Sequence, residues 1–116
     1  MHCRAVVLTS LLVLSATSGA RAAVPDRIVG LLGPAVGYLL SQSDLCQWGM
    51  SDRIRKAYDG AFTAIGMTEA QRMAAWDQAS ATQGRLGDVP GEAKDRMRTE
   101  TCTGAARERV EHDLRD

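Results

Sequence analysis

Apolar residues recur at intervals of three and four along the chain, and no stretch has the apolar–polar alternation of a half-buried strand. About ninety residues remain once the N-terminal export segment described below is set aside, which is enough for one core and no second domain. We therefore expect an all-α fold, a small single-domain bundle of four to five short helices. The clearest run predicts one apolar helical face of Cys46, Met50, Ile54, Ala57, Tyr58, Ala61, Phe62 and Ile65.

Pro34 interrupts an apolar run that extends from Ile28 to Leu40. Proline lacks a backbone N–H and disfavours helical geometry at the preceding residue, here Gly33. We therefore expect a helix break at Gly33 and a new helix that begins at Pro34. This second stretch should continue from Pro34 to Ile65, with a further helix start near Ser51.

Several other helix boundaries have sequence signals. Gly66 should end the preceding helix, and Thr68-Glu69-Ala70-Gln71 fits the capping-box pattern at the start of the next one. That helix is expected to continue to about Arg85, with Gly87-Asp88 forming the exit. Pro90 in a first turn then predicts another helix, and Thr103 is a suitable N-cap for the last one.

Residues 1–23 contain the three parts of a secretory signal peptide. Arg4 supplies the positive charge, residues 5–16 form an uncharged apolar run, and Ala20-Arg21-Ala22 fits the cleavage motif. The motif predicts a cut after Ala22 or Ala23 and a mature domain of residues 24–116. Because the apolar run is shorter than the roughly 20 residues of a membrane-spanning helix, we expect secretion and no transmembrane segment in the mature chain.

The charge of the expected mature domain disfavours nucleic acid as a partner. Removal of Arg4 and Arg21 leaves twelve basic and fourteen acidic residues, a net charge of −2, with both signs interspersed. Nucleic-acid binders usually gather a basic surplus on one face. Lysine occurs only at Lys56 and Lys94, and this preference for arginine is typical of GC-rich bacterial genomes, which favours a periplasmic location.

The mature domain would retain two cysteines, Cys46 and Cys102, because Cys3 leaves with the signal peptide. Two thiols in an oxidising compartment predict one disulfide. It would close a loop of about 57 residues and stabilise the fold by about 4 kcal/mol in the chain-entropy model. The alternative is a pair of unpaired buried cysteines. The bond would tie C-terminal helices that are poor in large apolar residues to the aromatic-rich part of the chain.

No catalytic constellation is evident in the mature domain. Nucleophilic catalysis needs a nucleophile beside a base, and the only histidine, His112, lies close to the C-terminus. Cys46 and Cys102 are too far apart for a C-x-x-C redox motif. We therefore expect neither a catalytic residue nor a cofactor, and a protein that is not an enzyme.

Two sets of residues are candidates for a small-ligand or metal carrier. Glu108, His112 and Asp116 are spaced by four, so on a helix they would share a face and could bind a divalent metal. An exposed charged stripe is the alternative. Trp48 and Trp76 could stack on a flat ligand, or they could anchor the core.

The apolar segment 28–40 is the best candidate for an interaction surface. A helix that is apolar on all sides is either buried or presented to a partner, and both interpretations remain open here. Gly30, Gly33 and Gly37 would allow close approach of a neighbouring helix, from the same molecule or from a second copy in a homodimer. The candidate residues are Ile28, Leu31, Leu32, Val36, Tyr38, Leu39 and Leu40.

With Cys46, Cys102 and the charged helix that follows Cys102-Thr103, the chain resembles the small periplasmic acid-stress chaperones. The shared features are a helical domain near this length and one disulfide between distant cysteines. The resemblance implies an acid-triggered mechanism. Acidification would neutralise the carboxylates while the basic groups keep their charge, so self-repulsion would open the domain and expose residues 28–40.

These observations favour a small exported, non-enzymatic protein that acts through contacts with a protein partner or client. Chaperone, adaptor and inhibitor are the classes that fit. The alternative is a carrier of a small ligand or metal.

Overall fold

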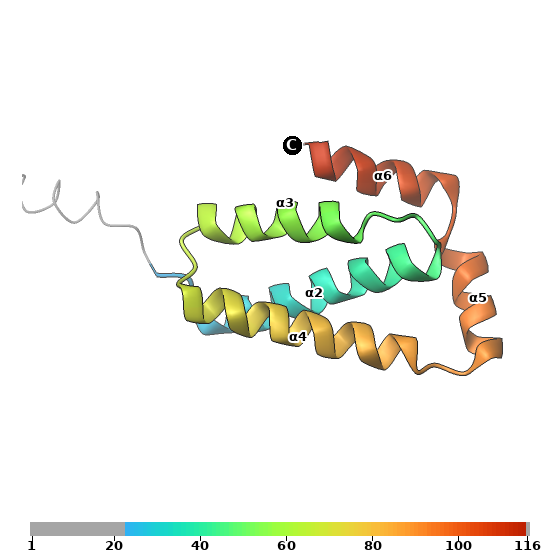
Figure 1. Ribbon diagram of the computed structural model, residues 1–116, viewed down its shortest axis with the longest axis horizontal. Helices are drawn as coiled ribbons and strands as arrows, with labels where there is room; N and C mark the ends of the chain where they lie inside the picture. The colour runs from blue at the N-terminus through green and yellow to red at the C-terminus, as the bar shows by residue number, and fades with distance from the viewer. Residues whose placement is uncertain (1–22, 116) are drawn as a thin grey trace, which may run out of the picture.

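The computed structural model describes residues 23–115, so the expected signal peptide, apart from Ala23, lies outside the described residues. This range contains five helices and no strand, which confirms the all-α prediction. The helices are α2 (Asp26–Leu45), α3 (Ser51–Ala64), α4 (Glu69–Gly87), α5 (Gly91–Thr101) and α6 (Gly104–Arg115). In Figure 1, α2, α3 and α4 lie alongside one another, α5 lies across one end of them, and α6 returns beside α3. Within residues 23–115, no helix is both long enough and apolar enough to cross a membrane.

The expected break at Gly33 is wrong, because α2 continues from Asp26 to Leu45 with Pro34 inside it. Pro34 deprives the carbonyl of Gly30 of its helical partner. Gly30 is exposed, so water can satisfy that carbonyl. Val29 on one side of Pro34 and Val36 on the other are both buried in the same core cluster. Because a break would separate these contacts, tertiary packing outweighs the local preference of proline.

A turn over residues 46–50 separates α2 from α3. The expectation of helix through these residues is therefore wrong, whereas the expected helix start near residue 51 is confirmed. Gln47 (φ 54°) and Gly49 (φ 66°) both have left-handed backbone geometry, which ends a helix. The buried hydroxyl of Ser43 accepts a hydrogen bond from the backbone N–H of Met50 at 2.9 Å and so closes the turn.

The capping box at the start of α4 is confirmed. The Thr68 hydroxyl accepts from the backbone N–H of Gln71 at 3.1 Å, and the Gln71 side-chain oxygen accepts from the backbone N–H of Thr68 at 3.1 Å. The Gln71 amide nitrogen also donates to the Val24 carbonyl at 2.8 Å and to the Asp26 carboxylate at 3.1 Å. One side chain therefore caps α4 and ties it to the start of α2. Gly66 (φ 95°) forms the turn just before it, as expected.

Helices α2 and α4 pack with their backbones in close contact. A Cβ atom on Gly37 would lie 2.5 Å from the Ala79 carbonyl oxygen, and one on Gly33 would lie 2.8 Å from the Ala75 carbonyl oxygen. Ala75 and Ala79 are themselves fully buried. Gly33 and Gly37 thus allow backbone contact with α4 of the same molecule, whereas a Cβ on Gly30 would meet nothing within 4 Å.

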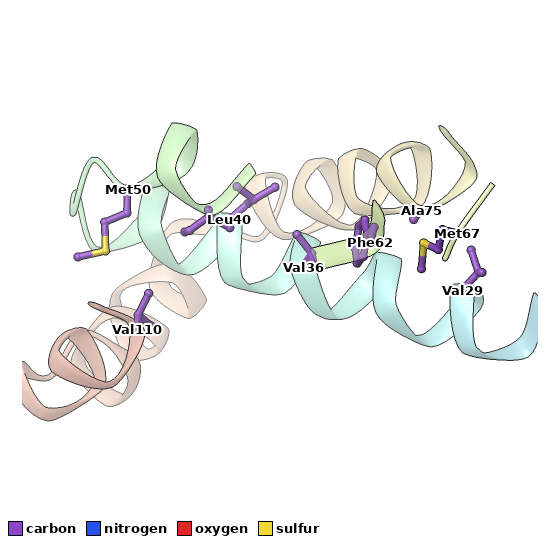
Figure 2. Packing of buried hydrophobic residues seen from close by; sticks show 9 residues of the cluster. Val29, Val36, Leu40, Met50, Phe62, Met67, Ala75 and Val110 are labelled. Atoms are coloured by element: carbon purple, nitrogen blue, oxygen red, sulfur yellow. The ribbon is translucent and has the colours of Figure 1, made fainter. Parts of the chain in front are cut away.

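The core lies between α2, α3 and α4 and extends to α6, as Figure 2 shows. Trp48, Tyr58 and Trp76 are only partly buried and pack against its edge. The Trp76 ring lies 5.5 Å from the ring of Phe62, between centroids. The buried cluster consists of Val29, Val36, Leu40, Met50, Ile54, Phe62, Met67, Ala75 and Val110.

The predicted disulfide between Cys46 and Cys102 is present, with the two Cα atoms 5.3 Å apart. Cys102 lies between α5 and α6, and Cys46 directly follows α2. Helix α5 has no fully buried residue, and in α6 only Val110 is buried. The Thr103 hydroxyl caps α6 by accepting from the backbone N–H of Ala106 at 3.1 Å. The disulfide thus joins the sparsely packed C-terminal helices to the end of α2.

Candidate functional site

The seven apolar residues expected to form an interaction surface are divided between the core and the exterior. Val36 and Leu40 are buried against the rest of the bundle. Ile28, Leu32 and Leu39 are partly buried. Only Leu31 and Tyr38 remain largely exposed, at 68% and 53% of their accessible surface. Segment 28–40 is therefore both core and surface, according to which face of α2 a residue occupies.

The exposed side of α2 carries an apolar strip. Leu31, Pro34, Ala35 and Tyr38 are spaced by three and four, so they lie along one helical face, and we call them the outer strip. None of the sixteen residues from 28 to 43 is charged. Exposed faces of helices in globular proteins usually carry charged side chains. The outer strip therefore differs from an ordinary solvated helix face.

A cleft of about 240 Å³ lies at the other end of α2, where it meets α4 and α5. Its apolar lining includes Leu45 of α2, Leu86 of α4 and Met97 of α5, with Tyr38 contributing from the outer strip. The polar lining residues are Ser41, Gln42, Gln47, Gln83 and Thr101, and the charged ones are Asp44, Lys94 and Arg98.

Two of the charged residues in this cleft are engaged within the protein. The Asp44 carboxylate accepts from the Ser51 hydroxyl at 3.1 Å and from the Gln83 side-chain amide at 2.6 Å. Arg98 donates through Nε to the Leu45 carbonyl at 3.3 Å and pairs with Asp95 at 3.2 Å. These bonds fix the mouth of the cleft by joining α2 to α4 and α5.

A second, more open hollow of about 320 Å³ lies between α2, α3 and α6. Its apolar lining includes Leu39, Tyr58, Val110 and Leu114, together with Ala35 of the outer strip. Tyr38 and Gln42 line both hollows. This part of α2 therefore forms a ridge with a hollow on each side. The Gln42 side-chain amide also donates to the Thr101 carbonyl at 3.0 Å, which ties the ridge to α5.

Of three hollows within residues 23–115, none is lined by both Trp48 and Trp76. Trp48 lines neither of the two hollows, and Trp76 borders a shallow depression on α3. The Trp76 indole N–H donates to the Asp59 carboxylate at 2.9 Å, and the Arg55 guanidinium lies 5.6 Å from the ring centroid. Ring packing and a cation–π contact thus engage Trp76 with its own molecule.

The candidate metal ligands Glu108 and His112 lie on α6, and Asp116 lies outside the described residues. Among residues 23–115, no group of three or more His, Cys, Asp or Glu side chains is arranged to hold a metal ion. The set of three therefore stays a prediction.

Sequence reasoning missed the cleft, although it contained a partial signal. Leu86 and Met97 are two of the few large apolar residues in the second half of the chain. Their separation in sequence from Leu45 hides the fact that the three share one hollow. Comparison with known proteins gives no match to this chain: no family model, curated protein or solved structure is significantly similar.

Proposed function

We propose that this chain is an exported, non-enzymatic protein that binds apolar segments of other proteins through the outer strip of α2. The observation that carries the proposal is the exposure of Leu31 and Tyr38 on a helix without charged residues from 28 to 43. Exposed contiguous apolar surface on a soluble domain commonly marks an interaction site. Chaperone, adaptor and inhibitor remain the classes that fit such a contact.

Export is supported by two independent features. The N-terminal residues have the three-part pattern of a signal peptide, and Cys46 and Cys102 are paired. Stable disulfides are typical of oxidising compartments such as the periplasm. Mass spectrometry of the protein purified from the periplasm should find a chain that starts at Ala23 or Val24 and thiols that become alkylated only after reduction.

The outer strip can be tested with a double variant, Leu31→Ser and Tyr38→Ser. The readout is light scattering from a chemically unfolded client protein that aggregates on dilution. The wild-type protein should suppress aggregation, and the double variant should lose most of that effect because its apolar contact area is reduced. A matched control is Met73→Ser, which removes an apolar side chain from α4 that is 61% exposed. Equal loss in the control, or no suppression by the wild type, would refute the proposal.

Acid activation, which the acid-stress resemblance implies, has a separate signature. Val36 and Leu40 are buried in the closed domain, so opening would add them to the surface already offered by the outer strip. The ion pair Arg98–Asp95 is solvent-exposed and the pair Arg107–Glu111 is only partly buried, so both contribute little, and opening would have to come from overall positive charge. Client protection should therefore be present at neutral pH and increase at pH 3. Protection that is the same at both pH values would remove the trigger and leave the outer strip as the binding site.

A second copy of this chain is the alternative occupant of the outer strip. A dimer joined there would bury Leu31 and Tyr38 and compete with client binding. The solution mass of the wild-type protein, compared with that of the double variant, tests this alternative. A dimer that becomes a monomer in the variant would assign the outer strip to self-association.

A further inference from the structure

The cleft between α2, α4 and α5 differs in chemistry from the outer strip. Leu45, Leu86 and Met97 give it an apolar interior formed by three helices. Charged residues from α2 and α5 border this interior. A concave apolar site with a few polar groups is the usual form of a small-molecule site, whereas the outer strip is an open surface.

Among the residues that the structure describes, Lys94 is the charged residue of the cleft whose side chain has no partner. Asp44 accepts two hydrogen bonds, and Arg98 is engaged with Leu45 and Asp95. Lys94 is half-buried and lines the cleft, yet within residues 23–115 its ammonium forms neither an ion pair nor a hydrogen bond. An ammonium that borders an apolar cavity can pair with an anionic oxygen of a bound ligand.

We propose that this cleft binds a small amphipathic carboxylate. The apolar part of the ligand would lie against Leu45, Leu86 and Met97, and its carboxylate would pair with the Lys94 ammonium. At about 240 Å³ the cleft is smaller than a typical site for a drug-sized ligand, which favours a short alkyl or aromatic acid. This site goes beyond the proposed protein contact, because its principal residues are not those of the outer strip.

The cleft can be tested with three probes that have the same alkyl chain: octanoate, 1-octanol and octylamine. Each is titrated into the intact mature protein, and binding is followed by the NMR signals of the methyl groups of Leu45, Leu86 and Met97. Octanoate should bind about tenfold more tightly than octylamine, because its carboxylate can accept from the Lys94 ammonium, whereas protonated octylamine cannot accept and is repelled by it. Neutral 1-octanol should bind with an affinity between the two.

The chain contains one other lysine, which provides a matched control. Lys94→Met should weaken octanoate binding about tenfold and leave 1-octanol binding nearly unchanged. Lys56→Met, on the exposed surface of α3, should change neither. Thermal unfolding of both variants, with midpoints close to that of the wild type, would show that the fold is intact.

Several results would overturn the cleft proposal. One is equal binding of octylamine and octanoate, and another is octanoate binding that Lys94→Met leaves unchanged. A third is ligand-induced shifts at Leu31 in place of shifts at the methyl groups of Leu45, Leu86 and Met97. The outer strip is judged by a different readout, client aggregation. Absent octanoate binding with intact client protection would therefore reject the cleft alone, and the reverse pattern would reject the outer strip alone.

Discussion

Helices α2 and α4 meet with their backbones in contact at Gly33 and Gly37, whereas α5 and α6 together bury one side chain, Val110, among the described residues. The first pair is held by close packing of small residues. The second pair is held by the disulfide at Cys102 and by hydrogen bonds from Gln42 and Arg98. A domain this small can thus combine a well-packed half with a half that depends on a covalent link.

The largest expected effect comes from removal of that covalent link. Replacement of both Cys46 and Cys102 by serine should lower the free energy of unfolding by about 4 kcal/mol, because the unfolded chain is no longer constrained by the loop. Urea denaturation measures the total change. Amide hydrogen exchange should show protection lost first in α5 and α6, while α2 and α4 retain it. Equal loss in all four helices would break the comparison between the two halves.

The next largest effect is expected at the contact between α2 and α4. In Gly37→Ala the new methyl group would lie 2.5 Å from the Ala79 carbonyl oxygen, so the two helices must move apart. We expect the free energy of unfolding to fall by about 1–3 kcal/mol, the usual cost of overpacking. Chemical denaturation measures the change. An unchanged midpoint would show that this contact is looser than the geometry implies.

A smaller effect is expected at the start of α4. Thr68→Ala removes the hydroxyl that accepts from Gln71, and loss of such a cap costs about 1 kcal/mol. Thermal unfolding should show a lower midpoint for this variant. Thr99→Ala is the matched control, since that exposed hydroxyl caps no helix and alanine is the better helix former. If the two variants change the unfolding midpoint equally, the capping box contributes little to the stability of the well-packed half.

The smallest effect should be a gain in stability. Gly30 is exposed within α2, and a Cβ there would meet nothing within 4 Å. Gly30→Ala should therefore raise the free energy of unfolding by about 0.5–1 kcal/mol, because alanine loses less backbone entropy in a helix. The opposite signs expected for Gly30 and Gly37, measured in one denaturation series, separate helix propensity from helix contact.

The local features of this fold could be read from the sequence. The capping box of Thr68 and Gln71, the turn at Gly66, the Thr103 cap and the disulfide all depend on neighbouring residues or on the residue type alone. The expected break at Gly33 failed because local reasoning could not weigh a lost hydrogen bond against the contacts that α2 makes with α4.

The candidate site was less accessible to sequence reasoning. Segment 28–40 was recognised as unusual, but its division into buried Val36 and exposed Tyr38 depends on which neighbours cover α2. The cleft depends on three helices, and Leu45, Leu86 and Met97 show no common spacing. The outer strip and the cleft both result from the way the helices pack against one another.

The position of the disulfide also determines how the domain would respond to a pulling force on its two ends. Helices α3, α4 and α5 all lie in the sequence between Cys46 and Cys102, so tension would pass from α2 directly to α6 through the sulfur atoms. Only the residues outside this loop could extend. A molecular motor that pulls on either terminus would unfold α2 or α6 and then reach the cross-linked loop. It must then translocate two strands at once or release the chain.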